Sequence, residues 1–230
     1  MKKSKLVTAL AAAAALCGGL YSAMASATVV YEHAPGTNSD LVSHHASRGP
    51  VLADDFSPAA SGWVTEVSWW GSRAGSTHWE VSFHTDNMGQ PNVDDPNEGA
   101  LAQHYLTATG VDPDGDGILL YTATWNFMDM FLEAGTTYWF SVANIAADWT
   151  WALGGAGGPT VGTETNNAVV STGDDCGNGG PHCGPWVELE NEGNENTNLA
   201  FRIVAVPEPG TLLLLGLGMA GIGYRRFRAA

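Results

Sequence analysis

Hydrophobic and polar residues alternate with a period of two through most of the chain between residues 51 and 205. In HWEVSFHT (78–85), Trp79, Val81 and Phe83 share one face, because successive side chains of a strand point to opposite faces. Comparable runs are GWVTEVSWWG (62–71), LLYTATWNF (119–127), TTYWFSVAN (136–144) and NLAFRIVA (198–205). The pattern predicts half-buried antiparallel strands.

Turn-forming residues separate these runs, in segments such as GSRAGS, DNMGQPNVDDPNEG, DPDGDG, EAG and GGAGGP. No stretch between residues 51 and 205 has a helical period with caps. Seven to nine short strands therefore fit this length. They predict an all-β fold, a single antiparallel β-sandwich of jelly-roll type.

The amino-terminal end departs from this pattern. Residues 1–27, MKKSKLVTALAAAAALCGGLYSAMASA, have a basic start, an Ala- and Leu-rich centre and small residues at Ala25 and Ala27. These features predict a signal peptide that forms a helix and is cleaved after Ala27 by signal peptidase. We therefore expect a signal peptide (1–27), a β-sandwich ectodomain (28–205) and a carboxyl-terminal segment (206–230).

The predicted ectodomain is strongly acidic. All lysines lie in the signal peptide, and residues 28–205 hold three arginines against 23 acidic residues, a formal charge of −20. Such a charge repels nucleic acid and anionic lipid and attracts cations. Nucleic acid is thereby excluded as a partner, while solubility in a salt-rich exterior and specific ion binding both stay open.

Two cysteines are left after removal of the signal peptide. Cys176 and Cys183 lie in the glycine-rich segment DDCGNGGPHC (174–183). In an exported protein this spacing predicts a local disulfide. A metal site is the weaker alternative, because it would need a compact set of further ligands and His182 alone gives it little support.

An acidic segment, DPDGDG (112–117), carries the sharpest chemical pattern. Asp112, Asp114 and Asp116 precede Gly117, and oxygen ligands at alternate positions before a sharp turn are typical of Ca²⁺ loops. The twelfth position is Ala123 instead of glutamate, which excludes a complete EF-hand. A partial Ca²⁺ loop, with Ca²⁺ as a cofactor, and an acidic β-turn are both open interpretations.

Nine tryptophans fall between residues 63 and 186. Trp69 and Trp70 are adjacent on one predicted strand, so they cannot both point into the core. One of them could lie at a rim and stack on a sugar ring, although large aromatic residues of sandwiches mostly fill cores.

Charged residues also share a predicted strand face. His78, Glu80 and His84 are a conceivable metal set, but a solvated polar face explains them more simply.

Catalytic signatures such as G-x-S-x-G, H-E-x-x-H and a Walker loop are missing from the sequence. We expect a non-catalytic protein. Carboxylates such as Glu66 and Glu80 leave a secreted hydrolase as a lesser alternative.

The carboxyl-terminal segment, VPEPGTLLLLGLGMAGIGYRRFRAA, joins a rigid start, an apolar run and an arginine cluster. The run 211–224 would span about 21 Å as a helix, against a hydrocarbon core of about 30 Å. Snorkelling of Arg225, Arg226 and Arg228 would extend it to a marginal span with the arginines in the cytoplasm. We therefore predict a short transmembrane helix.

This order of features resembles the PEP-CTERM sorting signal of Gram-negative bacteria. The matching residues are Val206, Pro207, Glu208 and Pro209, followed by the apolar run and the arginines. The resemblance implies transient anchoring in the inner membrane and recognition near 207–209 by an exosortase, a membrane cysteine transpeptidase-like enzyme. It further implies delivery to the cell surface or to the exopolysaccharide matrix of a biofilm.

The predicted ectodomain is similar to a β-sandwich that often precedes this signal. The matching phrases are ADDFSP (53–58), VSWWGS (67–72), VSFHTDNMGQP (81–91), LEAGTTYWFSV (132–142) and LAFRI (199–203). We expect an exported surface- or matrix-associated protein with a structural or ligand-binding role. The alternative is a carbohydrate-binding module, Ca²⁺-dependent or not, with exopolysaccharide as its partner.

Overall fold

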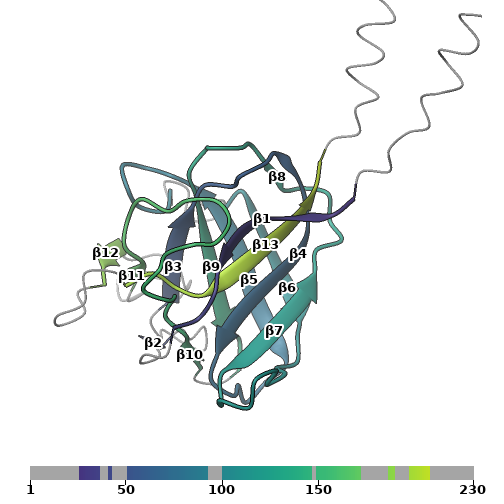
Figure 1. The fold of residues 1–230 in the computed structure, drawn as a ribbon, viewed down its shortest axis with the longest axis vertical. Helices are drawn as coiled ribbons and strands as arrows, with labels where there is room; N and C mark the ends of the chain where they lie inside the picture. The colour runs from purple at the N-terminus through teal and green to yellow at the C-terminus, as the bar shows by residue number, and fades with distance from the viewer. Residues whose placement is uncertain are drawn as a thin grey trace, which may run out of the picture. The chain divides into compact units, whose positions relative to one another are not determined.

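The computed structural model describes residues 26–36, 41–42, 51–92, 100–146, 149–171, 186–189 and 197–207. Ala27–Val206 forms one compact unit (Figure 1). The described residues contain thirteen strands and no helix, and thus no helix of theirs has the length and apolarity to cross a membrane. The predicted signal peptide (1–27) lies outside the described part of the chain except for residues 26 and 27, and the predicted transmembrane run (211–224) lies outside it completely.

One antiparallel sheet has seven strands. Along its main path these are β1 (Thr28–His33), β13 (Phe201–Val206), β4 (Gly62–Gly71), β10 (Thr150–Trp151) and β2 (Leu41–Val42). Two further strands pair with β4, and they are β7 (Leu119–Thr124) and β8 (Phe131–Leu132).

The other antiparallel sheet has six strands. In spatial order these are β12 (Trp186–Glu188), β11 (Val169–Ser171), β3 (Val51–Phe56), β9 (Tyr138–Asn144), β5 (His78–Thr85) and β6 (Ala102–Thr107).

The eight long strands pair in a nested order. The first, β1, pairs with the last, β13, and β3 pairs with β9 in the second sheet. Inside these pairs lie β4 with β7 and β5 with β6. A chain that folds back on itself in this way and rolls into two sheets is a jelly roll. The prediction of an all-β fold with two antiparallel sheets is confirmed.

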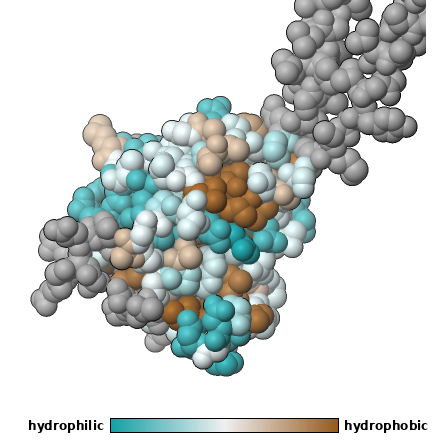
Figure 2. Space-filling model, in the orientation of Figure 1, coloured by the Kyte–Doolittle hydropathy of each residue, from teal (hydrophilic) through white to brown (hydrophobic). Residues whose placement is uncertain are grey.

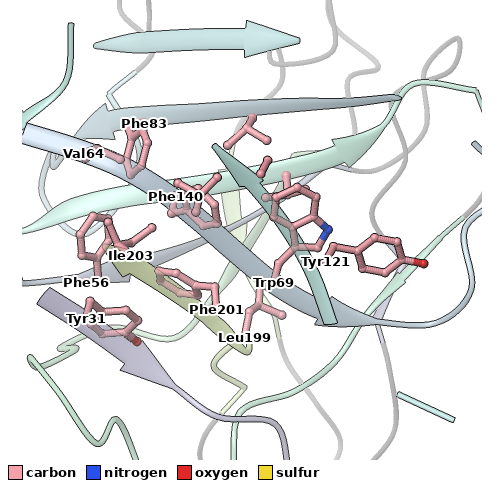
Figure 3. Close-up of a cluster of buried hydrophobic side chains, with 14 of the residues drawn as sticks. Tyr31, Phe56, Val64, Trp69, Phe83, Tyr121, Phe140, Leu199, Phe201 and Ile203 are labelled. Carbon is pink, nitrogen blue, oxygen red and sulfur yellow. The ribbon is translucent and has the colours of Figure 1, made fainter. Parts of the chain in front are cut away.

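Aromatic side chains from both sheets fill the space between them (Figure 3). Phe140 of β9 stacks on Phe201 of β13 with ring centroids 4.9 Å apart, and Tyr31 of β1 lies 4.5 Å from Phe201 on its other side. Offset and edge-on ring contacts of this kind stabilise a core beyond the area they bury.

The predicted strand faces are largely observed. Trp79, Val81 and Phe83 are fully buried in the core, as the alternation predicts. Trp69 also lies in this core, whereas Trp70 packs in a separate cluster with Ala152 and Ala200. Their opposite orientations are therefore confirmed.

The outer face of β5 differs from the expectation. Glu80, Ser82 and His84 are each 1% exposed. Of the conceivable metal set His78, Glu80 and His84, only His78 is exposed. The interpretation of this face as solvated is therefore wrong. The side chain of Gln103 on β6 contacts Glu80, and the Trp186 ring lies 6.5 Å from the His84 ring.

The surface mixes polar and apolar residues, with several apolar patches in view (Figure 2). Single exposed hydrophobic residues are ordinary, whereas grouped ones next to polar partners point to a binding surface. Tyr105, Phe127 and Met128 are large exposed hydrophobic residues on β6 and on the segment after β7.

Candidate functional site at the sheet edge

The candidate site lies where β6 of one sheet approaches β7 of the other (Figure 1). His104 is on the inward side of β6, between the core residues Ala102 and Leu106. Trp125, Phe127 and Asp129 follow at alternate positions after β7. We name His104, Trp125, Phe127 and Asp129 the rim cluster.

Asp129 joins two other members of the rim cluster, Trp125 and His104. Its Oδ1 accepts a hydrogen bond of 3.1 Å from the indole N–H of Trp125, and its Oδ2 pairs with Nε2 of His104. The rings of His104 and Phe127 stack, with centroids 3.5 Å apart and 4° between their planes. Trp125 meets both of these rings edge-on.

The rim cluster is anchored at one end and open at the other. Trp125 is 2% exposed and contacts Phe83 of the core edge to face, with ring centroids 5.2 Å apart. Phe127 is 45% exposed, and the side chain of Asp129 is 40% exposed. Solvent therefore reaches an aromatic ring and a carboxylate that are held in place by buried neighbours.

The backbone of this segment is strained at one residue. Met128, between Phe127 and Asp129, has a φ of +50°. The left-handed region is uncommon for a residue with a Cβ, and such strain costs on the order of 1 kcal/mol. It is often found where a loop positions functional side chains.

The opposite side of β6 carries a second exposed aromatic residue. Tyr105 is 65% exposed, and the negative charge of Glu80, with some burial, raises the pKa of its hydroxyl. Glu80 itself is buried and accepts a hydrogen bond from Nε2 of Gln103.

A group of ionisable residues is buried inside the fold. Tyr31 donates a hydrogen bond of 2.9 Å to Oε2 of Glu164, and Nδ1 of His33 lies 3.0 Å from the same atom. Nε2 of His33 lies 2.9 Å from the carbonyl oxygen of Gly155. Glu164 and the carbonyl of Gly155 both offer acceptor oxygens, so an imidazolium that is protonated on both nitrogens can donate to both at once.

The pKa values of this pair reflect their mutual attraction. Burial alone would lower the pKa of His33, but its hydrogen bonds to Glu164 and Gly155 outweigh burial and raise it. Burial alone would raise the pKa of Glu164, but His33 outweighs that effect and lowers it. Gly154 permits the close packing, because a Cβ there would lie 2.3 Å from the His33 ring.

Two further acids lie next to this pair. Asp54 is completely buried, and its oxygens accept the backbone N–H groups of Asp55 and Leu199. Burial, with the charge of Asp55, raises the pKa of Asp54 well above its usual range. Asp55 accepts hydrogen bonds from Thr165 and Asn166, and burial raises its pKa. Because these contacts join distant segments and are enclosed, we assign them to stability.

The tryptophans predicted to stack on a sugar lie elsewhere. Trp69 is 0% exposed and Trp70 is 8% exposed. Stacking on a ligand requires an open ring face, which neither residue offers in this structure. Among the aromatic residues named so far, the open rings are those of Phe127 and Tyr105.

The acidic segment 112–117 forms an exposed turn. Asp112 accepts the N–H groups of Gly115 at 2.7 Å and Gly117 at 3.2 Å, and Asp116 accepts that of Ile118 at 2.9 Å. Gly117 has a φ of +90°, which suits glycine. Nowhere in the described part of the chain do three His, Cys, Asp or Glu residues form a group that could hold a metal ion.

We expect millimolar Ca²⁺ to raise the midpoint of thermal unfolding no more than Mg²⁺ at the same concentration. Within the described residues no group of three possible ligands forms around Asp112, whose oxygens face backbone N–H groups of the turn, and weak screening of the acidic surface does not distinguish the two ions. Melting curves of the wild type and of Asp114→Asn measure this. A rise specific to Ca²⁺ that Asp114→Asn abolishes would instead establish a Ca²⁺ loop, because a ligand of the folded state must stabilise it.

Several predicted residues lie outside the described part of the chain, and their roles stay predictions. They are Ala25, Cys176, Cys183, Glu208, Pro209, Arg225, Arg226 and Arg228. Val206 is described as the last residue of β13, where it pairs with Trp63 of β4.

Sequence reasoning missed the rim cluster. Trp125, Phe127 and Asp129 are visible as alternate residues after a predicted strand, but His104 stands 21 positions before Trp125. Without the pairing of strands, nothing connects that histidine to them.

Comparison with protein families gives one match. The model of the PEP-CTERM protein-sorting motif matches residues 205–228. No match was found among curated proteins or solved structures. The chain therefore carries a PEP-CTERM protein-sorting motif, which indicates an exported protein with a membrane-associated tail that an exosortase sorts.

Proposed function

We propose that the protein is a non-catalytic component of the cell surface or exopolysaccharide matrix of a Gram-negative bacterium. The observation that carries the proposal is the position of the sorting motif. The motif begins at residue 205, and the folded unit ends at Val206. A sorting enzyme can act on this segment without unfolding more than the last residue pair between β13 and β4.

The ends of the chain serve delivery in this proposal. Signal peptidase removes residues 1–27, and the apolar run of the tail holds the protein in the inner membrane for a short time. The exosortase then acts near 207–209 and releases the sandwich to the outside. The strongly acidic body keeps the exported protein soluble and away from anionic lipid.

Deletion of residues 207–230 is expected to leave the fold intact and to abolish delivery to the surface. The deletion keeps β13 complete, including the pair between Val206 and Trp63. Fractionation of cells with an antibody against the sandwich measures delivery, and the thermal midpoint measures folding. Met88→Ala, at a fully exposed position, is the control that should be delivered normally. Normal surface amounts of the truncated protein would refute the sorting proposal.

A second candidate function is carbohydrate binding, with or without Ca²⁺. The rim cluster favours it, because an open aromatic ring beside a carboxylate is the pairing that sugar rings and hydroxyl groups use. This function and the sorting proposal are independent in their tests, since one concerns delivery and the other concerns the purified protein.

A further inference from the structure

We infer that the rim cluster binds a neutral polysaccharide, with a sugar ring on Phe127 and sugar hydroxyls on Asp129 and His104. The inference rests on the second proposed function and adds the residues and the chemical class of the ligand.

Phe127 is a preorganised stacking platform. One of its faces is covered by the imidazole of His104, which is itself paired with Asp129. Trp125 braces the ring edge-on and is rooted in the core. The exposed part of Phe127 therefore stays in place, and a ligand that stacks on it loses little further side-chain entropy.

Asp129 and His104 keep hydrogen-bonding capacity next to that ring. A carboxylate offers about four acceptor positions, and each oxygen of Asp129 has one protein partner in the rim cluster. Nε2 of His104 faces Asp129, which leaves Nδ1 as the second polar atom of the imidazole. Hydroxyl groups that donate to an ionised carboxylate form the stronger class of hydrogen bond.

The charge of the protein selects the class of polysaccharide. The region from 28 to 205 carries a formal charge of −20, which includes the carboxylate of Asp129 at the site itself. A uronic acid or sulfated chain would be repelled before it reached the ring. Neutral hexose polymers carry the apolar ring faces and the hydroxyl groups without that repulsion.

The strained residue supports a role for this segment beyond closing the core. Met128 holds a φ of +50° and a largely exposed side chain between the two binding residues. Phe127 and Asp129, on either side of it, contact the same imidazole. Strain of this kind is retained where side-chain placement matters.

Affinity electrophoresis of the full chain tests the inference. The gels contain hydroxyethyl cellulose, dextran or galactomannan as neutral probes and alginate as an anionic probe. Retardation by at least one neutral polymer and none by alginate is expected. Phe127→Ala should weaken binding about ten-fold, because loss of one ring contact is worth on the order of that factor.

Matched variants separate the rim cluster from the rest of the surface. Asp129→Asn should weaken binding, Phe127→Tyr should keep it, and Met128→Ala should leave it within about two-fold. Tyr105→Ala removes the open ring on the other side of β6 and should also have no effect. The thermal midpoints of the variants show that each is folded.

The outcomes that overturn the inference are distinct. Retardation that survives Phe127→Ala, or that is lost in Tyr105→Ala, would place the sugar elsewhere and leave carbohydrate binding standing. No retardation by any neutral polymer would remove both this inference and the second proposed function. Neither outcome affects the sorting proposal, which depends on delivery alone.

Discussion

Replacing Trp79 by alanine is expected to lower the free energy of unfolding by about 3–5 kcal/mol, out of the ~5–15 kcal/mol of a typical domain. Trp79 of β5 is fully buried and faces Trp69 and Tyr121 of the other sheet, with ring centroids 5.1 and 4.7 Å away. Trp149 meets it edge-on at 4.9 Å. Alanine would leave a cavity between the sheets and the carbonyl of Ala108 without its indole donor.

Urea denaturation followed by circular dichroism measures this loss. The control is Met88→Ala, which removes a side chain that is 98% exposed and should change stability by less than about 0.5 kcal/mol. Trp79→Phe keeps a ring between the sheets, so its loss in free energy of unfolding should lie between those of Trp79→Ala and the control. If Trp79→Ala cost no more than the control, the contacts of this indole would not be what holds the sheets together.

Strand alternation predicted the inward faces because the residues of a strand that face the core are hydrophobic and recur at every second position. Trp79, Val81 and Phe83 were assigned to one face and are fully buried. The same reasoning placed Trp69 and Trp70 on opposite sides. It could not show that Trp70 is also covered, because Ala152 and Ala200 reach it from segments distant in sequence.

The outer face of β5 shows the limit of this reasoning. Alternation puts Glu80, Ser82 and His84 on the side away from the core, and their polarity suggested solvent. In the structure, neighbours from other strands and segments cover them, among them Gln103 and Trp186. A period of two determines the side of a residue, but the cover over that side is a property of the whole fold.

Both side-chain clusters were invisible for a related reason. The rim cluster joins β6 to the segment after β7, and the buried group joins β1 to a residue 131 positions later. Spacing motifs detect ligands that are close in sequence, such as Asp112, Asp114 and Asp116. In the structure Asp112 and Asp116 close an exposed turn, while the contacts between distant residues required the jelly-roll pairing.

Glu164→Gln is expected to lower the free energy of unfolding by about 3 kcal/mol near pH 6, the lower end of what loss of one partner costs a buried pair. His33 and Glu164 are only 3% and 12% exposed. The variant leaves the charge of His33 without a counter-ion. The lower end applies because Glu164 also repels Asp54 and Asp55, so removal of its charge relieves that repulsion.

The pair has a defined pH window. The pKa of His33 is raised, so its contribution is present below about pH 6.5 and is lost as pH rises through the folded-state pKa. The pKa of Glu164 is lowered, so its contribution is present above about pH 4.5 and is lost as pH falls through the folded-state pKa. The free energy of unfolding of the wild type should therefore exceed that of Glu164→Gln most between these two pH values and much less at pH 9.

Unfolding curves of both proteins from pH 4 to pH 9 test this difference directly. General repulsion among the acids also lowers stability as pH rises, but it acts on both proteins and cancels in the comparison. Glu133→Gln, at an exposed position, removes the same charge without touching His33 and should follow the wild type. Because the two ring nitrogens of His33 face acceptors, a constant difference between wild type and Glu164→Gln across the whole range would contradict its positive charge. A difference that shrinks above pH 7 would establish that β1 is held to the segment around Glu164 by a buried ion pair.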